Sequence, residues 1–149
     1  MKPVFGTICI QADERGRMRI PALYRTALGE TILYGFKNKN GNYLNIFGQD
    51  TLNDLLEKLS DGVGVEESED VENVRDIYMN IFDIQEDKQG RFTIPPHIRE
   101  ELNLTKDVVF VGMGKKIELW DKVAYDEYAK QRRQKSGVVT TKDGKPLTY

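Results

Sequence analysis

Two short stretches of the chain gather side chains that could bind an anion. They read DERGRMRIPALYR at positions 13–25 and DKQGRFTIPPHIR at positions 87–99. The planar guanidinium of arginine donates two parallel hydrogen bonds, which fit a phosphate group or the O6 and N7 atoms of guanine. A turn that carries arginines between two strands could present them to the major groove of DNA, as β-ribbons do. The arginines best suited to such a contact are Arg15, Arg17 and Arg19.

The same arginines have a structural alternative. Arg17 and Arg91 each follow an aspartate by four residues, so each could pair with Asp13 or Asp87 and pin its turn. We interpret the two aspartates as caps of their turns rather than as catalytic acids, because an Asp side chain can bond the backbone of its own turn. Alternation along a strand would place Arg17 and Arg19 on one face and the apolar residues beside them on the other.

The two stretches are copies of one pattern, separated by a constant 74 positions without insertion or deletion. Such a repeat predicts two similar structural units. Glycine permits unusual backbone angles and proline begins helices, so we assign most of the shared residues to folding. We favour a structural role also for the arginine that ends each copy. The turn and structural positions are Asp13, Pro21, Arg25, Asp87, Gly90, Pro95 and Arg99.

Hydrophobic periodicity predicts the same order of elements around each copy. Because a lone pair of short strands is marginal in water, we expect the two halves to interleave into one shared sheet. The predicted fold class is α+β, with two pseudo-symmetric β-β-α-β-β-α halves. The expected strands are 4–10, 17–20, 31–36, 43–47, 80–84 and 91–94 with a hairpin over 107–120, and the expected helices are 22–28, 49–59, 68–79, 95–102 and 121–133.

The predicted organisation has four segments. The first half occupies residues 1–60, and an acidic connector with a linking helix occupies 61–79. The second half occupies 80–133. A flexible tail is expected at 134–149, because this segment is polar and lacks clear periodicity.

The net charge of −2 hides a segregation of charge along the chain. Residues 1–53 carry seven Lys or Arg against four Asp or Glu, residues 54–87 carry two against twelve, and residues 88–149 carry thirteen against eight. Local patches rather than the total charge decide where a polyanion binds, so the basic flanks leave DNA binding open. We expect the acidic middle part to lie away from DNA.

The composition argues against an enzyme, a metalloprotein and a membrane protein. His97 is the only histidine and Cys9 the only cysteine, so the usual zinc spacings and His-based triads are absent. We expect Cys9 to be a buried small hydrophobe. No apolar run approaches the roughly 18 residues of a membrane span, and no signal-peptide pattern is present, so we expect a cytoplasmic protein without cofactor, metal or small-molecule substrate. The acids that we interpret as solvated rather than as a cation site are Glu66, Glu67, Glu69 and Asp70.

The repeated pattern resembles a known protein family. D-x-x-G-R-x-x-I-P-x-x-x-R, running from a strand and turn into a short helix, is similar to the AbrB/SpoVT class of swapped-hairpin proteins. Two copies in one chain, the second followed by DVVFVGMGKKIELWD, resemble the MraZ family of bacterial transcriptional regulators in particular. The resemblance covers about residues 4–133. It implies a swapped-hairpin barrel of the double-split β-α-β type.

The resemblance also implies a function. A member of the family would bind repeated short motifs in the double-stranded DNA of the promoter ahead of its own operon, the division and cell-wall gene cluster. It would act chiefly as a repressor, associate with the nucleoid, and assemble into a closed ring of identical subunits, typically octamer-like. An antitoxin-like or other protein-interaction module of the same fold is the alternative.

Two departures from the family pattern D-x-K-G-R distinguish the copies. Arg15 stands in place of the usual lysine and keeps the charge, whereas Gln89 loses the charge in the second copy. Arg19 likewise has Thr93 as its counterpart. These differences favour the first copy as the principal DNA reader. With the resemblance, the residues that we expect to contact DNA are Arg15, Gly16, Arg17, Arg19, Lys88 and Arg91.

Overall fold

The structure is a computed structural model that describes residues 2–60, 68–135 and 137–148. Part of the predicted acidic connector, including Glu66 and Glu67, lies outside the described residues. No helix in the described part of the chain is long and apolar enough to cross a bilayer.

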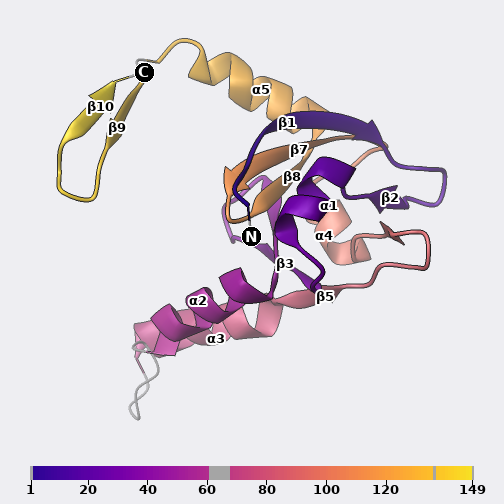
Figure 1. Ribbon diagram of the computed structural model, residues 1–149, viewed down its shortest axis with the longest axis horizontal. Coiled ribbons are helices and arrows are strands. Elements are labelled where there is room, and N and C mark those ends of the chain that lie inside the picture. The colour runs from indigo at the N-terminus through magenta and orange to yellow at the C-terminus, as the bar shows by residue number, and fades with distance from the viewer. Residues whose placement is uncertain (1, 61–67, 136, 149) are drawn as a thin grey trace.

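The strands form one large sheet and two small ribbons (Figure 1). The large sheet has six strands in the order β1-β7-β8-β4-β3-β5, all paired antiparallel. The ribbons are β2–β6 and β9–β10. The strands are β1 (Val4–Gln11), β2 (Met18–Arg19), β3 (Leu33–Lys37), β4 (Tyr43–Phe47), β5 (Phe82–Ile84), β6 (Arg91–Phe92), β7 (Asp107–Gly114), β8 (Ile117–Asp121), β9 (Val138–Thr140) and β10 (Pro146–Thr148).

The two repeats exchange strands throughout the fold. β1 of the first repeat pairs with β7 of the second, β4 pairs with β8, β3 with β5, and β2 with β6. The β1–β7 pairing is the longest, running from Val4 opposite Gly114 to Gln11 opposite Asp107. The prediction of one shared sheet is therefore confirmed, and the fold is α+β.

The helices agree closely with the expected ones. Pro21 and Pro95 occupy the cap position just before α1 and α4 rather than the first helical residue, with nearly identical φ and ψ of −50° and 135° against −51° and 137°. The carbonyl of each proline accepts the first helical hydrogen bond. The helices are α1 (Ala22–Leu28), α2 (Gln49–Ser60), α3 (Glu69–Asn80), α4 (Pro96–Glu101) and α5 (Lys122–Arg132).

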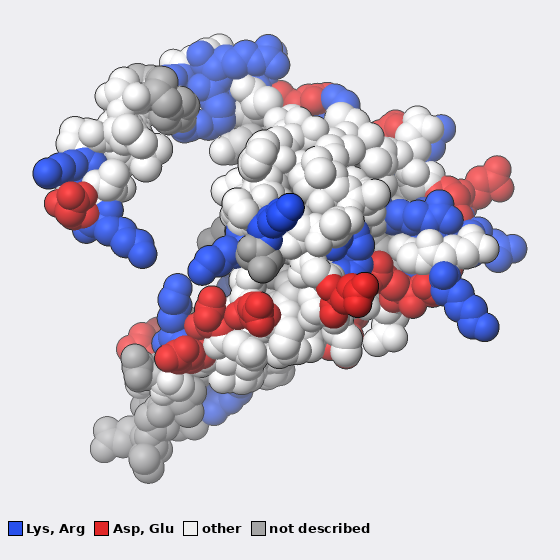
Figure 2. All heavy atoms as spheres, viewed as in Figure 1, with Lys and Arg blue, Asp and Glu red and all other residues white. Residues whose placement is uncertain are grey.

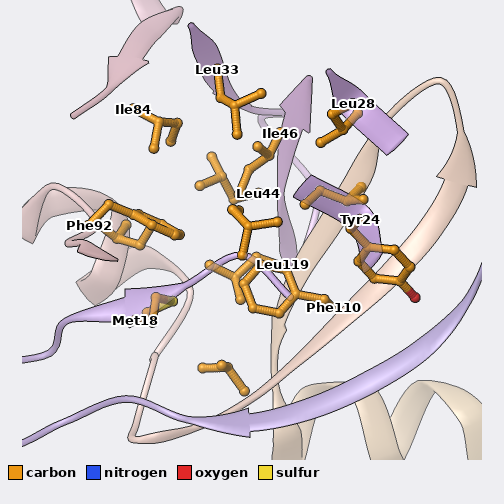
Figure 3. Close-up of a cluster of buried hydrophobic side chains, with 14 of the residues drawn as sticks. Met18, Tyr24, Leu28, Leu33, Leu44, Ile46, Ile84, Phe92, Phe110 and Leu119 are labelled. Atoms are coloured by element: carbon orange, nitrogen blue, oxygen red, sulfur yellow. The ribbon is translucent and has the colours of Figure 1, made fainter. Parts of the chain in front are cut away.

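One apolar core fills the space between the concave face of the sheet, α1, α4 and the β2–β6 ribbon (Figure 3). Strand alternation places Leu44 and Ile46 of β4 in this core and leaves Tyr43 and Asn45 on the opposite face. Phe110 of β7 is fully buried near the centre. The labelled side chains come from both repeats: Met18, Tyr24, Leu28, Leu33, Leu44, Ile46, Ile84, Phe92, Phe110 and Leu119.

α5 packs against the opposite face of the sheet. Asp121 caps the helix by accepting a hydrogen bond from the Val123 amide at 3.0 Å. The Trp120 ring stacks on Tyr43 at 4.9 Å between centroids and lies 5.0 Å from the ring of Tyr128. These contacts fix the direction in which α5 leaves the sheet.

Three expectations need correction. Cys9 is exposed, because its side chain points to the part of the outer sheet face that α5 leaves uncovered. The strands expected at 17–20 and 91–94 are shorter, since only Met18–Arg19 and Arg91–Phe92 form ladder pairs. The tail also contains a hairpin, β9–β10, that its polar sequence does not predict.

Candidate nucleic-acid interface

The two repeated turns lie side by side at the end of the molecule opposite the β9–β10 hairpin (Figure 1). The β2–β6 ribbon joins them, with Met18 opposite Phe92 and Arg19 opposite Arg91. Met18 and Phe92 point into the core, as the predicted alternation requires. Arg19, and the residues two positions along the strand from it, therefore point to solvent.

Each turn is closed by its aspartate through the same set of hydrogen bonds. Oδ1 of Asp13 accepts from the backbone amides of Arg15 and Arg17, both at 2.9 Å, and Oδ2 accepts from Nε of Arg17 at 2.6 Å. Asp87 binds the amides of Gln89 and Arg91 and Nε of Arg91 in the same way, at 2.8, 2.9 and 3.0 Å. Both aspartates thus bond the backbone of their own turns.

Glycine is required at the fourth position of each turn. Gly16 and Gly90 both have φ of +75°, a conformation that side chains of L-residues rarely adopt. Each donates its amide to the carbonyl of the aspartate three residues before it. Both glycines are therefore required by the backbone conformation of the turn, independently of any contact that they make with a ligand.

The arginines that follow the turns are held by ion pairs, as the structural alternative proposed. Arg17 pairs with Asp13 and Arg91 with Asp87 through Nε alone. Within the described residues their two Nη atoms make no hydrogen bond to protein, so each guanidinium keeps the donors of its outer edge for a ligand. The ion pair therefore fixes the orientation of each arginine side chain and leaves its Nη atoms able to donate hydrogen bonds to a ligand.

Arg19 has a contact that the sequence does not reveal. Its Nε donates to the carbonyl of Gln89 at 2.9 Å, and Nη2 lies 3.5 Å from Oε1 of Gln89. Gln89, the uncharged residue of the second turn, thus accepts the hydrogen bonds that connect this turn to the first. A basic residue at 89 would lack the side-chain acceptor and place a like charge beside Arg19.

Arg15 and Lys88 are the candidates whose side chains are unengaged. Both are exposed at the tips of their turns, and in the described structure neither side chain has a hydrogen bond or an ion pair. In Figure 2 basic side chains extend from this end of the molecule among the acids of the turns.

The arginines of the short helices α1 and α4, Arg25 and Arg99, each contact the other repeat. Arg25 binds Oε1 of Glu86, just before the second turn, at 3.0 Å, and also the carbonyls of Gly29 and Thr31. The guanidinium of Arg99 lies over Gly16, with Nη1 and Nη2 2.7 Å from where a Cβ would stand. Arg25 thus connects the end of its own helix to the segment before the second turn, while Arg99 adds a positive charge behind the first turn.

The turn carboxylates have lowered pKa values. For Asp13 the first cause is the hydrogen bond from the backbone amide of Arg17, and for Asp87 it is the corresponding bond from Arg91. A lowered folded-state pKa means that this contribution to turn stability is present above the ordinary value of 3.8 and is lost as the pH falls through the lowered pKa. The turns therefore keep their charge pattern throughout the neutral range.

This assignment predicts that Arg17→Ala leaves most of the pKa lowering of Asp13 in place, because the largest cause is a backbone group. Titration of the Asp13 and Asp87 carboxyl carbons by NMR in the wild type and the variant measures it. Asp87, untouched by the substitution, is the internal control. A return of the Asp13 pKa to 3.8 would show instead that the arginine side chain holds the carboxylate ionised.

The described residues offer no site for a metal: no three His, Cys, Asp or Glu side chains among them are grouped to hold an ion.

Comparison with known proteins gives one consistent result. A family model described as "MraZ protein, putative antitoxin-like" matches residues 77–143. The chain is similar to a protein named Transcriptional regulator MraZ from Caldanaerobacter subterraneus subsp. tengcongensis, with 32% identity over 118 residues that cover 79% of this chain and 80% of the relative. Proteins of the same name from Mycoplasmopsis pulmonis and Anaeromyxobacter dehalogenans are 32% identical over 144 residues and 33% over 126, covering 84% and 83% of this chain and 83% and 87% of the relatives.

Proposed function

This chain belongs to the MraZ family, and on that premise we propose that it is a transcriptional regulator that binds promoter DNA in a sequence-specific way and acts chiefly as a repressor. Its target would be repeated short motifs ahead of its own operon, the division and cell-wall gene cluster. It would work in the cytoplasm, associated with the nucleoid.

The observation that carries the proposal is the pair of equivalent turns held side by side on one ribbon. Arg15 and Lys88 extend from their tips, and Arg17 and Arg91 offer the outer edge of an oriented guanidinium. Arg19 fixes the spacing of the turns through Gln89. A two-stranded ribbon of this kind fits the major groove, where an arginine can bond guanine and neighbouring cations can bond phosphate.

The first turn is the stronger candidate for base contact. It carries Arg15 where the second carries Gln89, and Arg99 lies directly behind it. The second turn would then contact the backbone through Lys88 and Arg91. Phosphate contacts position a protein on the duplex, whereas base contacts specify the sequence, so the two turns would divide these tasks.

We propose further that the exchanged strands form a swapped-hairpin barrel, with the halves at 1–60 and 80–133, the connector at 61–79 and the tail at 134–149. One module with so few free cations would hold DNA weakly. A ring of identical subunits would present the turns in series, and linked sites act at a high effective concentration. Repeated motifs spaced to match adjacent subunits would then be selected.

A binding assay tests the function directly. Fluorescence anisotropy with the duplex from upstream of the operon should show affinity that falls steeply with salt and that exceeds the affinity for a shuffled duplex of equal length and composition. Equal affinity for both duplexes at every salt concentration would contradict sequence-specific regulation. No binding to either would remove the DNA-binding proposal altogether.

An antitoxin-like role is the second candidate, because the description of the matching family model includes it. Purification of the full chain from its own cells separates the two functions. A stoichiometric protein partner that dissociates only on denaturation would favour the antitoxin-like role, whereas recovery with upstream DNA favours the regulator.

A further inference from the structure

The C-terminal arm, defined as residues 130–135 and 137–148, needs a partner surface. Its β9–β10 hairpin pairs Val139 with Leu147, so these two side chains share one face. They are 49% and 58% exposed, and Val138 is 53% exposed on the other face. A two-stranded hairpin alone is only marginally stable in water, so an apolar face of this kind calls for something to cover it.

The arm also concentrates positive charge. Residues 130–145 hold six Lys or Arg and one Asp, in a chain whose net charge is −2. Within the described residues none of the six basic side chains has an ion pair or a side-chain hydrogen bond, although most basic residues elsewhere on the β-sheet and helices are paired. The six are Lys130, Arg132, Arg133, Lys135, Lys142 and Lys145.

The helix pair α2–α3 has the complementary character. The two helices carry seven Asp or Glu against two Lys or Arg, and α3 exposes Tyr78 and Met79 at 48% and 72%. Four of the acids have no ion pair with any described residue. They are Asp50, Glu57, Glu69 and Asp70. The helix pair thus combines unpaired negative charge with exposed apolar side chains. The arm likewise combines unpaired positive charge with exposed apolar side chains.

Within one chain the arm does not reach this surface. Figure 2 shows the arm and the helix pair on either side of an open hollow, with blue side chains on the arm and red ones facing the hollow from below. Asp121 and the Trp120–Tyr128 contact fix the direction of α5, and so hold the arm away from the body.

DNA is a poorer match for the arm than a protein surface. The arm and the repeated turns lie at opposite ends of the molecule (Figure 1), so a duplex held by the turns of one chain lies away from its arm. The phosphate backbone would also leave the face of Val139 and Leu147 uncovered.

We propose that the C-terminal arm of one copy docks on the α2–α3 helix pair of a second copy. The arm and the helix pair are different surfaces, so the contact is head to tail, and a series of such contacts closes into a ring when the rotation between copies permits. The inference rests on the ring in the proposed function and names the surfaces that build it.

Charge reversal in the full chain tests the docking. Lys142→Glu with Lys145→Glu, or Asp50→Lys with Glu57→Lys, should each abolish the assembled species at a protein concentration where the wild type is fully assembled. Light scattering after size exclusion, without DNA, measures this. The four-substitution chain carries both reversals and should regain the wild-type mass. Lys2→Glu with Lys106→Glu is the matched control, since both lysines are exposed and lie outside the two surfaces and outside the residues proposed to contact DNA.

The outcomes separate the inference from the function. A monomeric wild type that binds promoter DNA would remove the ring and the docking together and leave the regulator. A wild type and an arm variant of equal mass would overturn the docking alone. An arm variant that stays assembled but loses affinity for DNA would assign the arm to DNA instead. Failure of the combined reversals to restore assembly would also overturn the pairing of these two surfaces.

Discussion

Replacing both Arg15 and Arg17 with alanine is expected to weaken binding to the upstream duplex on the order of 10²-fold. An arginine that bonds a base or a phosphate contributes about 1–3 kcal/mol, and each 1.4 kcal/mol is about tenfold in affinity. Among the residues that the structure describes, Arg15 has no side-chain partner and Arg17 keeps its Nη atoms available. Fluorescence anisotropy at fixed salt measures the change.

The second turn supplies a matched comparison. Lys88→Ala with Arg91→Ala also removes two positive charges and one Asp–Arg ion pair. Arg91 is the counterpart of Arg17, whereas Lys88 lies one residue before Gln89, the counterpart of Arg15. We expect about a tenfold loss here, and less loss of discrimination against a shuffled duplex, because this turn would contact the backbone. Equal losses in the two double variants would contradict the first turn as the principal reader.

Both double variants must remain assembled for the comparison to hold. Arg15 and Lys88 are exposed and Arg17 and Arg91 are half-buried, and the two turns lie at the end of the molecule away from the arm (Figure 1). Their masses in solution should match the wild type. Normal binding by the fully assembled Arg15→Ala, Arg17→Ala variant would show that the site is elsewhere.

Phe110→Ala is expected to lower the free energy of unfolding by about 3–5 kcal/mol, the range for a buried aromatic side chain replaced by alanine. Phe110 is fully buried where side chains of both repeats meet (Figure 3). Since small domains are stable by only about 5–15 kcal/mol, this change would remove a large part of the total. Urea unfolding followed by circular dichroism measures it.

Phe5→Ala is the control with the same chemistry. Phe5 lies on β1, which pairs with the strand that holds Phe110, but its side chain is 79% exposed. The expected change is within about 0.5 kcal/mol. If both variants lost similar stability, Phe5 would have to be covered in solution by a surface that a single chain does not supply.

The fold was largely predictable because local signals and the repeat agree. The polar and apolar alternation at 17–20 and the helix expected at 121–133 each reflect interactions within a few residues. The structure buries Met18 and Ile20, as the alternation requires, and begins α5 directly after Asp121. Short strands are stable only when they pair with other strands, so the sequence predicted one sheet shared by the two halves. The exposure of Cys9 could not be predicted, since it depends on how far α5 extends over the sheet.

The candidate site was predictable in its residues and only partly in its contacts. The aspartate caps and ion pairs span four residues, so spacing alone reveals them. The bond from Arg19 to Gln89 and the position of Arg99 over Gly16 join residues 70 and more positions apart. The repeat offset matches Arg19 with Thr93 and Gly16 with Gly90, and it gave no sign of these contacts between the halves.

The pairing of β1 with β7 has a consequence for how the chain is made. Val4 finds its partner only when Gly114 has been synthesised. At about 5–20 residues per second, a ribosome leaves β1 without that partner for on the order of 10 s. During this interval the apolar segment VFGTICI is an open strand edge, which can join another nascent chain. Biosynthesis of this protein therefore depends on keeping β1 from wrong pairing, and a chaperone that binds the emerging N-terminus is expected to raise the yield of folded chain.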